Sequence, residues 1–136
     1  MKLYELLANA LIVLLSAFGF MRGSEFITRG EMSLQNASEL YVKLSQYIDI
    51  QSMGWGLLLG SIILLGSVFN KNKTAFILMI IGGAITASIH MFYGLVAVEG
   101  AKVIATYYTT LTISIYECLI CGIGVYGLWK NNKNKD

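Results

Sequence analysis

Four long apolar segments dominate this chain of 136 residues and limit what it can fold into. They cover residues 3–21, 53–69, 74–98 and 105–129. A helix needs about 17–25 predominantly apolar residues to cross the hydrocarbon core of a bilayer, and each segment has such a length. The connections at 70–73 and 99–102 are short, so consecutive segments must be antiparallel neighbours. The sequence predicts an all-α fold: one domain, an integral membrane antiparallel four-helix transmembrane bundle.

The basic residues indicate how these segments are oriented in a membrane. With the N terminus inside, six of the ten Lys and Arg residues fall on the inner side. Positive residues are enriched on the cytoplasmic side of membrane proteins, so we expect a multi-pass protein of the cell membrane with both termini cytoplasmic and 130–136 as a cytoplasmic tail. That tail is the only basic cluster, which argues against nucleic-acid binding. The inner residues are Lys2, Lys71, Lys73, Lys130, Lys133 and Lys135.

The connection 22–52 is the one sizeable polar stretch between segments. Its apolar residues recur at steps of three and four, which is the spacing of one helix face, and Ser33 precedes them as a candidate N-cap. We therefore expect an extracytoplasmic amphipathic helix lying on the membrane surface or over the bundle. A lid or a docking surface for another protein is the alternative. The apolar face consists of Leu34, Ala37, Tyr41, Leu44 and Ile48.

Glu117 stands near the middle of the last apolar segment, with no Lys or Arg around it. A carboxylate at membrane depth costs several kcal/mol unless it is neutralised or paired, which makes it a pointer to a functional site. His90, the only histidine, lies on the preceding segment at a depth that differs by about 6 Å at 1.5 Å per residue. We expect the two side chains to pair. Thr110 and Ser114 share the Glu117 face, and Thr86 shares the His90 face.

This predicted pair has a structural and a functional interpretation. Polar residues often tie membrane helices together, for roughly 0.6–2 kcal/mol. Alternatively, the pair binds the polar end of a hydrophobic small molecule or passes protons. Under the binding hypothesis, the predicted ligand-binding residues are His90, Glu117, Thr86, Thr110 and Ser114, with no metal ligand among them.

Cys118 and Cys121 form the second candidate site. Their surroundings, Tyr116-Glu-Cys-Leu-Ile-Cys121 in the fourth helix of a small bundle, resemble the active motif of the vitamin K epoxide reductase family. The resemblance implies a quinone-linked thiol–disulfide oxidoreductase. That family also uses a second cysteine pair in the outer loop, and 22–52 contains no cysteine. The sequence therefore favours two buried, unpaired thiols.

A second resemblance extends over more of the chain. Gly54-Trp-Gly56 and Gly60 open the second segment, two adjacent glycines lie in the third, and a glutamate lies in the fourth. This layout resembles the DoxX-like group of small four-helix bacterial membrane proteins, one branch of which has an arginine where His90 aligns. The resemblance implies a small bacterial membrane protein, and some members are associated with redox partners at the membrane.

The sequence thus favours a non-enzymatic role. We expect binding of a hydrophobic small molecule, a lipid or a membrane-protein partner through the His90 and Glu117 site. Two alternatives remain: the oxidoreductase that uses Cys118 and Cys121, and an oligomeric pore or proton path lined by the Glu117 stripe. The lipid bilayer is the only partner that the composition itself predicts, and a homo-oligomer stays open.

Overall fold

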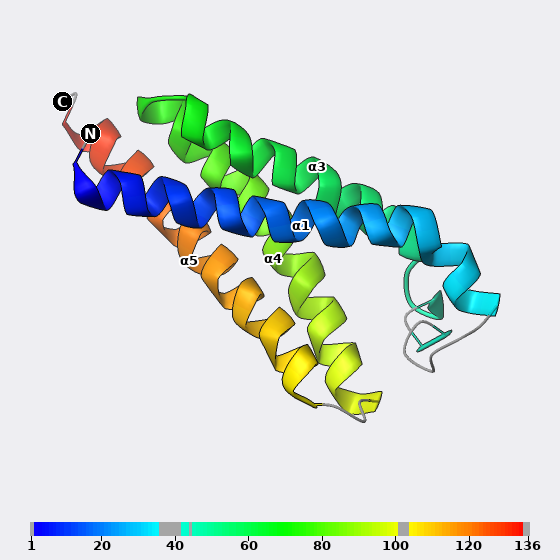
Figure 1. Ribbon diagram of the computed structural model, residues 1–136. Coiled ribbons are helices and arrows are strands. Elements are labelled where there is room, and N and C mark those ends of the chain that lie inside the picture. The colour runs from blue at the N-terminus through cyan, green and yellow to red at the C-terminus, as the bar shows by residue number, and fades with distance from the viewer. Residues whose placement is uncertain (1, 36–41, 44, 101–103, 135–136) are drawn as a thin grey trace.

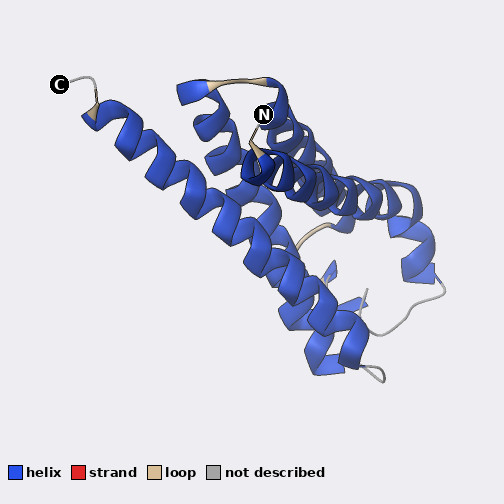
Figure 2. Ribbon diagram, turned by 60° about the vertical axis from the view of Figure 1, so that its left-hand side comes forward, coloured by secondary structure: helices blue, strands red, loops and turns tan. Residues whose placement is uncertain are grey.

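The structure, a computed structural model, describes residues 2–35, 42–43, 45–100 and 104–134. It contains four long helices: α1 (Leu3–Gln35), α3 (Ile50–Phe69), α4 (Asn72–Gly100) and α5 (Ile104–Lys133). All regular structure in the described ranges is helical (Figure 2). The predicted all-α fold with four helices is confirmed, and each helix contains a stretch that is long and apolar enough to cross a membrane.

The helices pack in chain order, each mainly against the next. α1 lies along α3, α3 packs on α4, and α4 and α5 form the most extensive interface. α1 and α5 make few contacts with each other. Figure 1 shows consecutive helices running in opposite directions, with both chain termini at the same end. The bundle is therefore tightly packed across three interfaces and loosely packed across the fourth.

The first helix is longer than its apolar segment predicted. α1 continues through Gln35, so the first 14 residues of the predicted outer connection belong to it. Ser33 lies inside α1 and does not cap a separate helix, so that prediction is wrong. Charged side chains end an apolar segment but do not stop a helix, and no proline interrupts this part of the chain.

The predicted amphipathic helix lies largely outside the described residues, including Ala37, Tyr41 and Leu44. The described end of that connection folds towards α4, where the Tyr47 ring lies edge-on to Phe92 with centroids 6.3 Å apart. The connection between α3 and α4 is as tight as the sequence predicted.

Asp49 fixes the start of α3. Its carboxylate accepts hydrogen bonds from the backbone N–H and the hydroxyl of Ser52, both at 2.9 Å. An N-cap side chain of this kind satisfies one of the unpaired amides at a helix start. These hydrogen bonds from Ser52 hold the pKa of Asp49 below its usual value. α3 therefore begins three residues before its predicted apolar segment.

A buried polar layer crosses the middle of the bundle between two apolar clusters. One cluster includes Phe26, Leu57 and Tyr93, and the other includes Leu15 and Leu64. Ser16 of α1, Ser61 of α3 and Thr86 and His90 of α4 fall between the positions that belong to these two clusters, whereas Ser67 is buried nearer the end of α3. The layer thus lies at mid-height, where polar groups are most costly in a bilayer. It comprises Ser16, Ser61, Thr86, His90, Thr110, Ser114 and Glu117.

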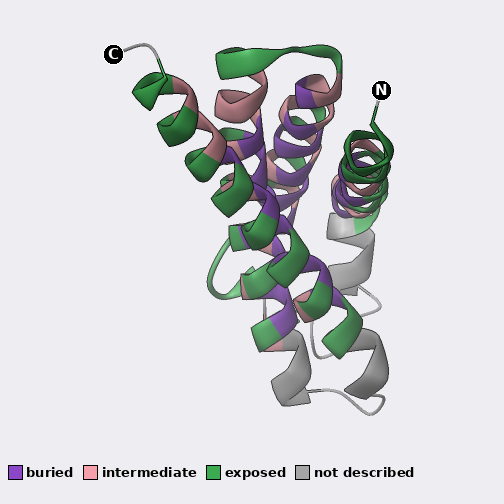
Figure 3. Ribbon diagram, turned by 90° about the vertical axis from the view of Figure 1, so that its left-hand side faces the viewer, coloured by how far each residue is buried: buried purple, intermediate pink, exposed green. Residues whose placement is uncertain are grey.

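The outer sides of the helices are apolar. Figure 3 shows buried positions where helices face one another and exposed positions on the outside. Large apolar side chains are exposed along the length of each helix, for example Leu14, Leu59, Ile81 and Leu119. Soluble monomers rarely expose such extensive apolar surface, whereas a bilayer favours it.

Glycines allow the helices to approach each other closely. A Cβ added at Gly82 of α4 would lie 2.5 Å from the backbone nitrogen of Leu64 in α3. One added at Gly83 would lie 3.1 Å from the backbone oxygen of Glu117 in α5. Small residues permit backbone contact of this kind between helices. Gly83 therefore brings the backbone of α5 close to the helix that carries His90.

Candidate functional site

His90 and Glu117 form a direct contact at the centre of the buried polar layer. His90 Nδ1 lies 2.8 Å from Glu117 Oε2, and both residues are fully buried. The two side chains come from α4 and α5, which have the most extensive interface in the molecule. The predicted pairing is confirmed. For this distance to arise, the face of α4 that carries His90 must lie against the face of α5 that carries Glu117, as the residue spacing indicated.

The three hydroxyl residues predicted to accompany the pair are also buried. Ser114 donates a hydrogen bond of 2.9 Å to the backbone oxygen of Ala87, which ties α5 to α4. Thr86 donates to the backbone oxygen of Gly82 within its own helix, also at 2.9 Å. Thr110 lies one turn before Ser114 on the same face of α5 and is buried as well. These groups surround the pair, and Thr86 and Ser114 already have partners.

The outer atoms of the pair differ from these hydroxyls. In the described part of the chain, neither His90 Nε2 nor Glu117 Oε1 has a hydrogen-bond partner. Leaving a buried polar atom unpaired costs about 1–3 kcal/mol, so proteins rarely retain one without a reason. The contact between Nδ1 and Oε2 therefore leaves half of each side chain's hydrogen-bonding capacity unused.

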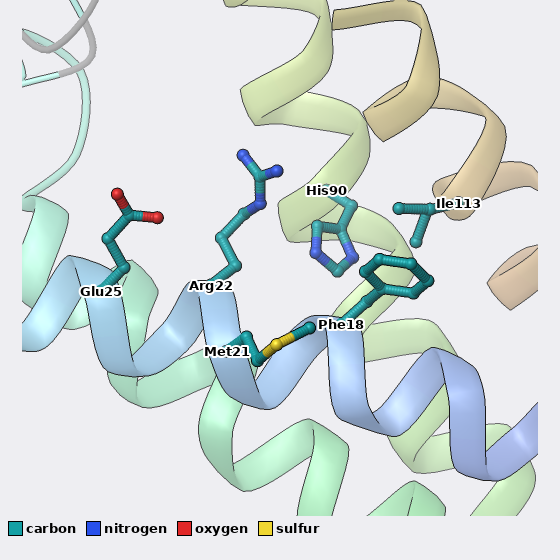
Figure 4. A pocket seen from close by; sticks show the side chains of 6 residues that line it. All are labelled: Phe18, Met21, Arg22, Glu25, His90 and Ile113. Carbon is teal, nitrogen blue, oxygen red and sulfur yellow. The ribbon is translucent and has the colours of Figure 1, made fainter. Parts of the chain in front are cut away.

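His90 forms part of the wall of a cavity of about 140 Å³ between α1, α4 and α5. Figure 4 shows side chains from the three helices around it, with the His90 ring between the Arg22 side and the side of Phe18 and Ile113. The Arg22 guanidinium lies over the ring of Tyr93, 4.7 Å from its centroid. The cavity thus combines a buried imidazole, a cation and apolar side chains. Its lining residues are Phe18, Met21, Arg22, Glu25, His90 and Ile113.

Sequence reasoning missed the contribution of α1 to this cavity. Phe18, Met21, Arg22 and Glu25 are spaced at three, four and seven residues from the first, which places them on one helix face. The signal was present in the sequence. It was overlooked because the first helix was expected to end at residue 21, so Arg22 and Glu25 were assigned to the connection that follows it.

Ser16 and Ser61 were also missed as candidate residues. Both are buried, and within the described residues neither hydroxyl has a hydrogen-bond partner. They lie in a cavity of about 260 Å³ between α1 and α3, which is otherwise apolar. Ser61 packs directly against Gly19, so the hydroxyl occupies space that a side chain on α1 would fill. None of the described residues that line this cavity is charged.

The cysteines do not form a buried pair. Cys118 is exposed on the outer side of α5, so the prediction that both thiols are buried is wrong for this residue. Cys121 is half-buried, and its thiol lies 3.6 Å from the backbone oxygen of Ile80. Both are free cysteines, as expected. The face of α5 that carries Glu117 turns towards α4, and Cys118 follows it directly in sequence and therefore points elsewhere.

Metal-ligating side chains do not cluster in the part of the chain that the structure describes. No group of three His, Cys, Asp or Glu side chains in the described ranges could hold a metal ion.

Comparisons of the chain with protein-family models, curated proteins and solved structures find no match. The geometry around His90 is therefore the basis for assigning a function.

Proposed function

We propose that the chain is an integral membrane protein that binds the polar end of a lipid-soluble small molecule in the His90 cavity. The four helices supply membrane spans whose outer surfaces are apolar. Lipid-soluble molecules would reach the site from the bilayer, because α1 and α5 pack loosely beside it. The protein acts by binding and is not an enzyme in this proposal.

The orientation proposed from the charges puts both termini in the cytoplasm. The termini and the α3–α4 connection lie at one end of the bundle (Figure 1). This connection contains Lys71, and the last turn of α5 contains Lys130 and Lys133. Labelling of a cysteine introduced at Lys133 tests this orientation, since sealed cells should protect it. The resemblance to DoxX-like proteins and a bacterial source stay predictions.

One observation carries the proposal: His90 Nε2 is buried, has no described partner and belongs to a residue that lines a cavity. A pair that only ties two helices together needs the contact between Nδ1 and Oε2 and nothing more. A ligand that hydrogen-bonds Nε2 would recover the free energy lost by burying this atom. Binding sites commonly combine apolar walls with a few placed polar groups of this kind.

The two alternative functions have less support. A pore between copies of the chain would need the polar stripe of α5 on the outside, but Thr110, Ser114 and Glu117 are buried within the single chain. An oxidoreductase would use Cys118 and Cys121, which line a different cavity of about 280 Å³ between α4 and α5. No described carboxylate or imidazole lines that cavity to activate a thiol.

Lipid extracts of the purified protein test the proposal without assuming a head group. The wild type and a His90→Phe variant are purified from the same membranes, and the molecules retained by each are compared by mass spectrometry. We expect one small amphiphile to be retained by the wild type and at least about tenfold depleted in His90→Phe, because its hydrogen bond to Nε2 is lost. Thr112→Val, on the exposed side of α5, serves as the control and should retain it. Identical extracts from all three proteins would contradict the proposal.

A further inference from the structure

We infer that the ligand is a single-chain amphiphile with an anionic carboxylate head, held between His90 and Arg22. This inference rests on the proposed function and names the chemistry of its ligand. It follows from the hydrogen that His90 must carry on Nε2, the charges around the cavity, and the size and outlet of the cavity.

The hydrogen on Nε2 follows from the need for the pair to be neutral overall. An uncompensated charge at this depth in a bilayer is costly. In one neutral arrangement the Glu117 carboxyl O–H donates to His90 Nδ1, and in another the imidazolium Nδ1–H donates to the Glu117 carboxylate. Nε2 carries a hydrogen in both. A third arrangement has the carboxyl hydrogen on Oε1 and none on Nε2. Glu117 does not line the cavity, so a ligand there could accept a hydrogen from Nε2 but not one from Oε1, and the third arrangement is disfavoured.

The ligand must therefore present a hydrogen-bond acceptor to Nε2, and the charges around the cavity favour an anion. Arg22 is half-buried and forms no ion pair with a described carboxylate; it stacks on Tyr93 instead. Glu25 is exposed, and in Figure 4 it lies beyond Arg22 as seen from His90. An anionic group between His90 and Arg22 would thus meet two donors before it approached the carboxylate of Glu25. Hydrogen bonds in which both groups are charged are the strongest available here.

The cavity is suited to a small head group with its tail outside. Its volume of about 140 Å³ holds only a few heavy atoms. Pockets that enclose a whole drug-sized ligand are larger, roughly 300–1,000 Å³. On the apolar side of the cavity, Phe18 is 37% exposed and Met21 is 60% exposed. An alkyl chain that leaves the cavity beside them would pass from the protein directly into the bilayer.

Four probes with the same alkyl chain test the head group: dodecanoate, its methyl ester, dodecyl phosphate and dodecylamine. Binding is measured by calorimetry at mildly alkaline pH, on protein in nanodiscs of uncharged phosphatidylcholine, with protein-free nanodiscs subtracted. We expect dodecanoate to bind at least about tenfold more tightly than the ester or the amine, because only it can pair with Arg22 and accept from Nε2. Dodecyl phosphate should bind more weakly than dodecanoate, because its head has three terminal oxygens to satisfy and the site offers two donor groups, His90 Nε2 and the Arg22 guanidinium.

Three variants locate the effect. Arg22→Gln should weaken dodecanoate at least about tenfold while leaving the methyl ester within about twofold. Glu25→Gln should tighten dodecanoate by about threefold at low salt, because a repulsive carboxylate is removed from the mouth of the cavity. Arg29→Gln, an exposed arginine on the same helix, is the matched control and should change neither.

The outcomes separate the inference from the proposed function. If the ester or the amine binds as tightly as dodecanoate, and His90→Phe abolishes that binding, the site exists but the carboxylate assignment is wrong. Tighter binding of dodecyl phosphate would assign the site to a phosphate head instead and would also overturn the inference. If no probe binds saturably, or if His90→Phe binds all of them as the wild type does, the proposed function fails as well.

Discussion

His90→Phe and Glu117→Leu are each expected to lower the free energy of unfolding by about 2–4 kcal/mol. Each change removes one partner of the contact between His90 Nδ1 and Glu117 Oε2, and both residues are fully buried. The remaining polar group then has neither water nor a partner. The replacements are apolar and close in size, so little of the loss should come from a cavity.

The double variant should be less destabilised than the sum of the two single variants by more than about 1 kcal/mol. An apolar pair of similar volume can replace a buried polar pair at little cost, because no group is left unpaired. Reversible unfolding in mixed micelles measures all four proteins, and Thr112→Val provides a control on the exposed side of α5 that should stay close to the wild type. Additive losses would mean that the contact contributes nothing beyond its separate side chains.

Gly82→Ala should destabilise the protein by about 1–3 kcal/mol. The new methyl group would lie 2.5 Å from the backbone nitrogen and 2.7 Å from the Cα of Leu64 in α3. Backbone atoms cannot move aside as the end of a flexible side chain can, so α3 and α4 would have to separate. Because α4 carries His90, the separation should also weaken retention of the ligand.

Gly122→Ala is the matched control on α5, because an added Cβ there meets nothing within 4 Å. It should leave stability unchanged or slightly raised, since alanine favours helix over glycine by up to about 1 kcal/mol. The same unfolding assay compares the two variants. Equal stability of Gly82→Ala and Gly122→Ala would show that α3 and α4 are not in close backbone contact.

The pairing of His90 with Glu117 was predictable because helix periodicity and depth both follow from sequence spacing. A buried carboxylate needs a partner, and only one histidine was available at that depth. The hydroxyl residues Thr86, Thr110 and Ser114 indicated which helix faces approach each other. These constraints act locally along two consecutive helices, so they needed no knowledge of the rest of the fold.

The role of Arg22 was not predictable in the same way. Hydropathy indicates where a segment can span a bilayer, whereas the end of a helix depends on capping and backbone propensity. The sequence reading ended the first helix at residue 21 and so separated Arg22 from Phe18, although the two lie one turn apart on α1. The exposure of Cys118 was also missed. Glu117 faces α4, and the next residue of a helix points in a different direction, so Cys118 lies on the outer side of α5.

The nitrogen-15 spectrum of the imidazole ring tests the central claim most directly, because His90 is the only histidine in the chain. Protein labelled with 15N-histidine in lipid bilayers should give one Nδ1 and one Nε2 signal. We expect Nε2 to carry a directly bonded hydrogen, and a dodecanoate concentration that just saturates the wild type should shift its resonance there much more than in Arg22→Gln. A hydrogen-free Nε2, or a spectrum that dodecanoate leaves unchanged, would contradict this claim.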